Sequence, residues 1–294
     1  MDHPAPADSD RGFDLVGPDR PERPVILSIP HAGREYPPAL LARARVGADM
    51  LHRLEDRWVD LLAGPLAAQG YTMLIAHAPR ALIDLNRHER EIDPAMIAGL
   101  PRDVALHSSA KLRGGLGLLP RRMAGAPELW RGPFGWAEVE GRIAHIHRPY
   151  HATLAGLMQA AREAHGHAIL VDLHSMPPLG LSGFGGPPPQ LVLGDRFGRS
   201  ASSRLMACAA EVAGAHGLRV GQNHPYAGAY LIDRHGRPDR GCHAIQMEFD
   251  RSLYLDAALD SPGPGLARTQ AILAAMVTAL ERELPRSDYA MAAE

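Results

Sequence analysis

Short apolar runs alternate with stretches of helical periodicity along most of the chain. The strand-like runs are residues 24–30, 71–78, 81–87, 167–175, 190–195, 218–223 and 243–250. The helix-like stretches are 47–69, about 135 to 165 with a restart near Pro149, 199–215 and 265–283. This alternation predicts an α/β fold in which a mostly parallel sheet carries helices on both faces.

No repeat, linker or change of composition divides this pattern. We therefore expect one α/β domain over residues 23–294. It follows a flexible tail, residues 1–22, which is rich in Pro and Asp and has little to bury. Residues 88–133 and the Pro/Gly-rich stretch 176–190 read as irregular loops, and the sequence assigns no role to either.

Composition excludes several classes of protein. The formal net charge of −2 favours neither nucleic acid nor an anionic membrane. No apolar run reaches the ~18–20 residues of a membrane span, and the polar N-terminus lacks the order of a signal peptide, so we expect a cytoplasmic enzyme. Two cysteines against 16 histidines make nitrogen and oxygen ligands the expected chemistry. No oligomeric state is assigned.

Four of the expected strands carry a polar side chain at or just beyond their carboxyl ends. These side chains are His31, Asn86 with Arg87, His174 and Glu248. One such histidine is more often structural than functional. Because open α/β sheets gather the carboxyl ends of their strands at one edge, four of them together predict a site there.

Two histidines and a carboxylate form the usual catalytic zinc arrangement. His31 and His174 are the candidate nitrogen ligands. Either Glu55 or Asp56 would supply the carboxylate, and helical phase weakly favours Glu55, although both also fit a solvated helix flank. The chain has no H-E-x-x-H motif, so spacing alone supports a metal only weakly. Asp172 could orient the His174 ring or face the site itself.

Glu248 is the best candidate for a general base, because it interrupts an apolar strand and a buried carboxylate needs a partner. A salt bridge to Arg251 is the structural alternative. Asn86 and Arg87 suit recognition of a substrate carboxylate. For Arg87, an ion pair with Asp84 or Glu89 is the structural alternative.

Two further segments carry candidate substrate contacts. Arg148, in the run "HIHRPYH", could bind a second anion, whereas Pro149 argues against His147 and His151 as a metal pair. The loop "NHPYAGAY" at 223–230, which includes Asn223 and Tyr226, reads as a substrate lid or as a plain turn.

Seven motifs together resemble the N-formylglutamate amidohydrolase family over residues 24–256. They occur in the family's order: "SIPHAG" (28–33), "EDRWVDLL" (55–62), "LIDLNR" (82–87), "RPYH" (148–151), "VDLHS" (171–175), "DRHG" (233–236) and "HAIQMEFDRSLYLD" (243–256). The resemblance implies a three-layer sandwich with a mostly parallel mixed sheet, similar to zinc carboxypeptidases. It also implies hydrolysis of N-formyl-L-glutamate to formate and L-glutamate in histidine catabolism.

The resemblance also implies a set of site residues. His31, Asp56 and His174 would bind one Zn²⁺ per chain, or another divalent ion, so Asp56 is preferred to Glu55. Glu248 would be the catalytic carboxylate, and Asn86 with Arg87 would bind the acidic substrate. His147 replaces a tryptophan frequent in the family, and the loops 176–190 and 223–230 are particular to this chain. The alternatives are the same machinery acting on another small N-acyl amino acid or a peptide, and a catalytically silent member that binds an acidic ligand.

Overall fold

The computed structural model describes residues 11–123, 125–181 and 186–284. Their backbone divides into two compact units. Of the described residues, one unit holds Leu15–Ile29, Arg57–Leu74 and those from Leu154 to Leu284, and the other holds residues 11–14, Pro30–Asp56 and Ile75–Thr153. The single domain expected over 23–294 stays a prediction.

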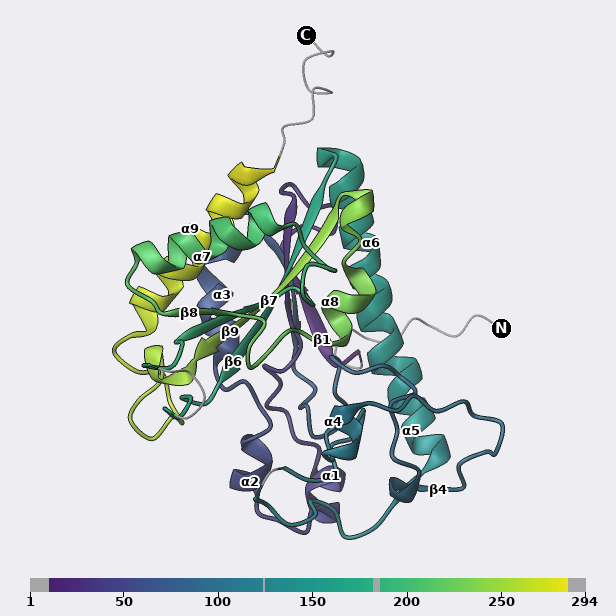
Figure 1. The fold of residues 1–294 in the computed structure, drawn as a ribbon. Coiled ribbons are helices and arrows are strands. Elements are labelled where there is room, and N and C mark those ends of the chain that lie inside the picture. The colour runs from purple at the N-terminus through teal and green to yellow at the C-terminus, as the bar shows by residue number, and fades with distance from the viewer. Residues whose placement is uncertain (1–10, 124, 182–185, 285–294) are drawn as a thin grey trace. The chain divides into compact units, whose positions relative to one another are not determined.

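Seven strands of the described chain form one twisted sheet in the order β1-β3-β2-β6-β9-β7-β8 (Figure 1). Its strands are β1 (Phe13–Val16), β2 (Val25–Ile29), β3 (Thr72–Ala76), β6 (Ala168–Met176), β7 (Leu191–Gly194), β8 (Val220–Gln222) and β9 (Cys242–Asp250). The pairs β2–β6, β6–β9 and β7–β8 are parallel, whereas β7 and β9 are antiparallel. The mostly parallel mixed sheet is therefore confirmed.

Helices cover both faces of this sheet, which gives the expected three layers (Figure 1). One face carries α3 (Val59–Ala67), α7 (Ser203–Ala215) and α9 (Leu266–Glu283); the other carries α6 (Arg148–His165) and α8 (Tyr230–His235). Strands β2, β6 and β7 are buried throughout. Such continuous burial is typical of parallel strands covered on both faces. The predicted similarity to zinc carboxypeptidases stays a prediction.

The second unit is built from short elements around a core of its own. They are α1 (Pro38–Arg43), α2 (Ala48–His52), η2 (Pro94–Met96), β4 (Ile97–Ala98), α4 (Ala110–Arg113), β5 (Phe134–Gly135), α5 (Trp136–Arg142) and the π-helical turn η3 (Ile143–His147). Leu51, Ile83, Trp130, Phe134 and Val139 are among the buried residues of this core. Residues 88–133 are largely irregular, as expected. The remaining 3₁₀ turns are η4 (Pro238–Arg240) and η5 (Arg251–Leu253).

The structure differs from the sequence-based expectation at several places. Residues 13–16 form the edge strand β1 and bury Phe13, whereas we expected a flexible tail over 1–22; residues 1–10 lie outside the described residues. The helix expected over 47–69 is broken into α2 and α3. Residues 81–87 form turns rather than a strand: Ala81 and Ile83, whose apolar character suggested a strand, are buried from turns in the core of the short elements.

The proline after residue 148 does not break the helical run that contains it. Pro149 occupies the second residue of α6, where the preceding π-helical turn continues directly into the α-helix. His147 and His151 therefore do face each other, with ring centroids 4.4 Å apart. Both rings bond main-chain carbonyls, of Arg87 and Leu85 respectively. The pair thus fixes the neighbouring segment 85–87.

No helix of the described residues combines the length and the apolar character that crossing a bilayer requires.

Helix α8 buries a histidine that makes stability depend on pH. Burial, and then the charges of Arg234 and Arg237, lower the pKa of His235 from 6.5 to about 3. The unfolded chain therefore binds a proton near pH 6.5 that the folded protein excludes until about pH 3. Because the unfolded state binds more protons in this window, the free energy of unfolding falls as the pH falls from 6.5 to 3.

We expect His235→Gln to remove this dependence. Between pH 7 and pH 5 the wild type should lose about 2 kcal/mol more of its free energy of unfolding than the variant does. Urea unfolding at the two pH values measures the difference. His216→Gln, on the exposed end of α7, is the matched control and should behave as the wild type. An equal loss in wild type and His235→Gln would contradict the assignment.

Candidate metal centre and active site

His31 follows the buried strand β2 and is itself 2% exposed. The backbone after His31 packs directly against the backbone at Ala78: a Cβ atom added to Gly33 would lie 2.1 Å from the carbonyl oxygen of Ala78. Only a glycine permits this approach. The His31 Nε2 atom lies 2.8 Å from Asp84 Oδ1, and Nδ1 lies 3.5 Å from Asp56 Oδ2. The ring is therefore held by a carboxylate on its Nε2 side.

Asp84 is a fully buried carboxylate that connects several site residues. It accepts a hydrogen bond from Arg80 Nε at 2.8 Å and from the Asn86 main-chain N–H at 2.9 Å, and Arg87 Nε lies 3.8 Å away. Burial alone would raise the pKa of Asp84. The charges of Arg80, Arg87 and His31 outweigh burial and hold this pKa well below its ordinary value. The lowered pKa therefore favours the ionised form of Asp84, which lies behind His31.

Sequence reasoning considered Asp84 only as an ion partner of Arg87. That ion pair exists at 3.8 Å, and Asp84 also makes a shorter contact, at 2.8 Å, with His31 Nε2. The sequence carried a signal for it, since arginines stand four residues before and three residues after this acid. A buried acid flanked in this way has the charges that keep it ionised and able to orient a metal-binding imidazole.

We expect Asp84→Asn to weaken metal binding by about 10–100-fold, since a carboxylate behind a ligating histidine contributes that much to affinity. Competition with a metal-sensitive chelating dye measures the change. Asp93→Asn is the matched control: Asp93 also accepts from a main-chain N–H two residues on and pairs with an arginine, Arg121. Equal metal affinity in both variants would show that Asp84 does not contribute to metal binding.

His174 lies near the end of β6 and is held in a comparable way. Its Nε2 atom lies 3.0 Å from Asp172 Oδ2, two residues earlier on the same strand. Asp172 in turn accepts a hydrogen bond from Ser28 Oγ at 3.4 Å. Of the two positions considered for Asp172, the structure therefore supports the one that orients the His174 ring.

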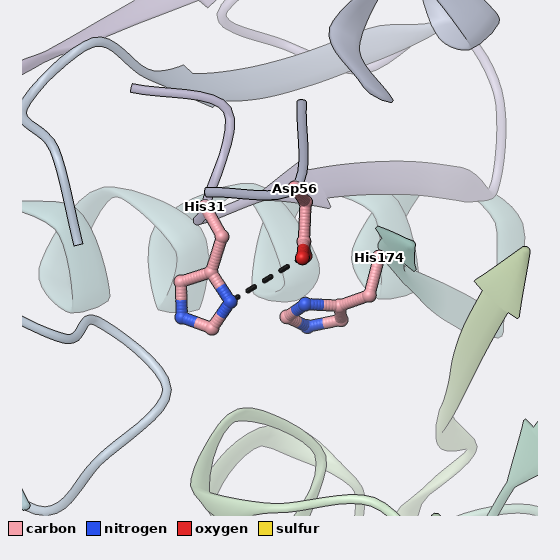
Figure 2. Close-up of side chains that lie close together, drawn as sticks. All are labelled: His31, Asp56 and His174. Atoms are coloured by element: carbon pink, nitrogen blue, oxygen red, sulfur yellow. Dashed lines mark ion pairs between the residues drawn. The ribbon is translucent and has the colours of Figure 1, made fainter. Parts of the chain in front are cut away.

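The structure brings His31, Asp56 and His174 together (Figure 2). One candidate ligand atom of each lies within 4.8 Å of the other two, and all three residues are buried. Two imidazoles and a carboxylate are a donor set that suits zinc. In both rings a carboxylate holds Nε2, which is the usual support for a ligating histidine. This buried group is therefore a candidate metal site.

The choice between Glu55 and Asp56 depends on the break between α2 and α3. Asp56 lies in this break rather than on a helix, and its N–H donates to the His31 carbonyl at 2.9 Å. Trp58, which precedes α3, has a left-handed backbone with φ 56°. Glu55 accepts a hydrogen bond from Tyr36 Oη at 2.8 Å instead. The helical phase that favoured Glu55 therefore does not apply, and Asp56 is the carboxylate that belongs to the candidate metal group.

Glu248 stands beside His174 in the sheet. β6 and β9 pair in parallel, with His174 and Glu248 as direct register partners. The Glu248 side chain is 8% exposed and accepts a hydrogen bond from Gln246 Nε2 at 2.7 Å. Arg251, the alternative partner considered for it, donates to Ser175 Oγ at 3.1 Å. The carboxylate is thus buried, partnered and next to the strand that carries a candidate ligand.

Asn86 and Arg87 are both buried in the turn after Asp84. Arg87 donates from Nε to the Leu116 carbonyl at 2.8 Å and from Nη1 to the Asn86 carbonyl at 2.7 Å. The guanidinium plane is therefore fixed by main-chain oxygens. Within the described residues, Nη2 is the guanidinium nitrogen to which no hydrogen bond is assigned. A contact with a substrate carboxylate through this atom stays a prediction.

Arg148 forms an ion pair with Glu89, with Nε at 2.8 Å from Oε2. This hydrogen bond raises the pKa of Arg148 and lowers that of Glu89. The Arg148 side chain is 55% exposed, so the pair is screened by solvent. The predicted contact between Arg148 and a second substrate anion would have to compete with Glu89.

The side chain of Asn223 has a structural role in the structure. It donates to Asp195 Oδ1 at 2.7 Å and accepts from the N–H groups of Asp195 and Phe197. These bonds occupy both ends of the amide and do not favour its predicted contact with substrate. Tyr226 lies half-buried in the same loop, and its substrate contact stays a prediction.

Known proteins similar to this chain agree on one family. The sequence model of N-formylglutamate amidohydrolase matches residues 23–255. A protein named N-formylglutamate deformylase from Pseudomonas aeruginosa PAO1 is 30% identical over 243 residues, which cover 79% of this chain and 82% of that protein. A protein of the same name from Pseudomonas putida is 29% identical over 248 residues, with the same coverage of both chains.

One solved structure carries the same family name, and a second shares the fold. The crystal structure of N-formylglutamate amidohydrolase from Ralstonia eutropha JMP134 is 31% identical and superposes with a TM-score of 0.82, over 92% of this chain and 96% of that chain. A gene product from Agrobacterium tumefaciens is 18% identical, with a TM-score of 0.66 over 94% of this chain and 96% of that chain, and shares the fold.

Proposed function

Because the chain belongs to the N-formylglutamate amidohydrolase family, we propose that it hydrolyses N-formyl-L-glutamate to formate and L-glutamate. The observation that carries this proposal is the buried group of His31, Asp56 and His174, next to a strand that presents Glu248. The reaction would be a cytoplasmic step of histidine catabolism.

We assign one Zn²⁺ to the buried group. Since carboxylates hold both Nε2 atoms, His31 and His174 would bind the metal through Nδ1, and Asp56 would add an oxygen ligand. Zinc bound there would polarise the formyl carbonyl and increase the acidity of a bound water. With these three residues as its ligands, the metal would supply the Lewis-acid chemistry of a catalytic zinc site.

Glu248 is the proton carrier in this proposal. It accepts a proton from the attacking water as the oxygen–carbon bond forms at the formyl carbon. When the carbon–nitrogen bond breaks, Glu248 returns this proton to the nitrogen of the leaving glutamate. No other reactant is needed, because water supplies the oxygen that ends in formate. The register of Glu248 with His174 supports this role.

Arg87 and the polar residues around it are proposed to bind the acidic substrate. A guanidinium matches the planar shape and the charge of a carboxylate. Main-chain carbonyls hold this guanidinium in one orientation, which limits the entropy lost on binding. Asn86 is proposed to contribute beside it, and Arg148, Asn223 and Tyr226 remain candidate contacts.

Formate release from N-formyl-L-glutamate, measured before and after removal of metal by a chelator, tests the proposal. N-acetyl-L-glutamate and N-formyl-L-leucine serve as comparison substrates, since the first changes the acyl group and the second removes the side-chain carboxylate. Metal-dependent formate release that favours N-formyl-L-glutamate supports the proposal. Zinc-dependent turnover of another amide, without turnover of N-formyl-L-glutamate, would show that the assigned substrate is wrong. The absence of both metal and turnover would indicate a catalytically silent binding protein.

A further inference from the structure

Gln246 lies two residues before Glu248 on β9, so both side chains lie on the same face of the sheet. The Gln246 side chain is buried and connects two parts of the site. Its Nε2 donates to Glu248 Oε1 at 2.7 Å, and its Oε1 accepts from the Ala229 main-chain N–H at 3.2 Å. A single amide therefore links the proposed base to the loop before α8.

The backbone around this loop fixes the orientation of the amide. Gly194 on β7 is the register partner of Gln246, and a Cβ atom added to it would lie 2.7 Å from Ala227 C and Gly228 N. The loop backbone thus lies directly against the strand, which is possible only with glycine at residue 194. Because Ala229 N–H meets the amide oxygen, the amide nitrogen must face Glu248.

The neighbouring strand shows the same pattern. On β6, Asp172 holds His174, two residues further along. In the parallel register, Asp172 is the partner of Gln246 and His174 is the partner of Glu248. Each strand therefore carries a supporting side chain followed, two residues later, by a candidate functional one. Because Asp172 and Gln246 are register partners, the pairing of β6 and β9 places both supporting side chains at the same level of the sheet.

We propose that Gln246 is a positioning residue that directs the Glu248 carboxylate for proton transfer. The inference rests on the proposed function, in which Glu248 is the base. A primary amide suits the role because it donates a hydrogen bond to a carboxylate and has no acidic proton that would compete for the base. Since Gln246 acts through Glu248, it should affect kcat rather than substrate binding.

Two substitutions separate this role from that of a simple anchor for the loop. Gln246→Met keeps the length of the side chain and removes both hydrogen bonds. Gln246→Glu keeps an acceptor for the Ala229 N–H but sets a second carboxylate against Glu248, and two such carboxylates share one proton instead of both ionising. If positioning of Glu248 is the role, both changes lower kcat, and Gln246→Glu is the more damaging one. If anchoring of the loop is the role, Gln246→Met instead raises KM, because that loop carries the candidate substrate contacts Asn223 and Tyr226.

We expect kcat for formate release to fall about tenfold in Gln246→Met and about 100-fold in Gln246→Glu. KM should change by less than about threefold in both, because substrate binding is retained. Metal content and thermal unfolding are measured in parallel, so that only folded, fully metal-loaded variants are compared. Gln159→Met is the matched control: Gln159 donates to Glu163 at 2.8 Å in an exposed pair on α6, and its loss should leave kcat unchanged.

Wild-type kcat in both Gln246 variants would overturn the inference, and so would a milder effect of Gln246→Glu than of Gln246→Met. Either result leaves the proposed function intact, provided that the wild type releases formate. A wild type that releases no formate from N-formyl-L-glutamate would instead overturn the proposed function, and with it this inference.

Discussion

Glu248→Gln should retain its metal and lose turnover. The amide has nearly the same shape as the carboxylate but cannot accept a proton from the attacking water, so kcat should fall by about 10²–10⁴-fold, the usual contribution of a general base. The metal should stay because Glu248 is not a member of the His31, Asp56 and His174 group. Formate release and zinc content, measured on the same preparation, check both halves of this expectation.

Glu163→Gln is the control for this substitution. Glu163 also accepts a hydrogen bond from a glutamine, Gln159, but the pair is exposed on α6 and Glu163 is not a member of the candidate metal group. Its kcat should equal that of the wild type. If Glu248→Gln kept full activity, Glu248 would not be the base, and the role proposed for Gln246 would fail with it.

The second large effect is expected at Asp56. Asp56→Asn keeps the size of the side chain but removes the charged oxygen that the metal would bind. We expect metal affinity to fall by more than the ~100-fold that loss of a residue behind a ligand can cause. Formate release should disappear at limiting zinc and return in part when zinc is added in excess. Titration of the metal-free protein with zinc, followed by activity, measures both effects.

Glu55→Gln is the neighbouring control, and it also tests the alternative that the sequence left open. Glu55 is buried and bonded to Tyr36, so its substitution should reduce stability rather than metal affinity. A variant at Glu55 that loses zinc, beside a variant at Asp56 that keeps it, would reverse the assignment of the carboxylate ligand.

The strands of the central sheet could be predicted from sequence because their apolar runs are continuous. Strands buried on both faces, such as β2 and β6, have no polar face to confuse the pattern. Residues 81–87 looked similar but form a turn, since apolar residues of a turn can also enter a core. The strand β1 was missed because only Phe13 of its four residues is buried.

The candidate ligands could be located because His31 follows a strand and His174 lies near the end of one. The carboxylate could not be chosen from periodicity, because the left-handed backbone at Trp58 interrupts the helix on which that argument depended. The supporting contacts were harder to foresee. Asp84 holds His31 across 53 residues of sequence, and Gln246 bonds to Ala229 through the packing of a loop against β7. Such contacts depend on tertiary structure, which local patterns do not encode.

Diffraction from zinc-soaked crystals, recorded at the zinc absorption edge, tests the central claim most directly. The account predicts one strong anomalous peak per chain, about 2.0–2.1 Å from Nδ1 of His31 and of His174 and about 2.0–2.2 Å from a carboxylate oxygen of Asp56. A peak bound to other residues, or no peak in crystals whose dissolved protein releases formate, would contradict it.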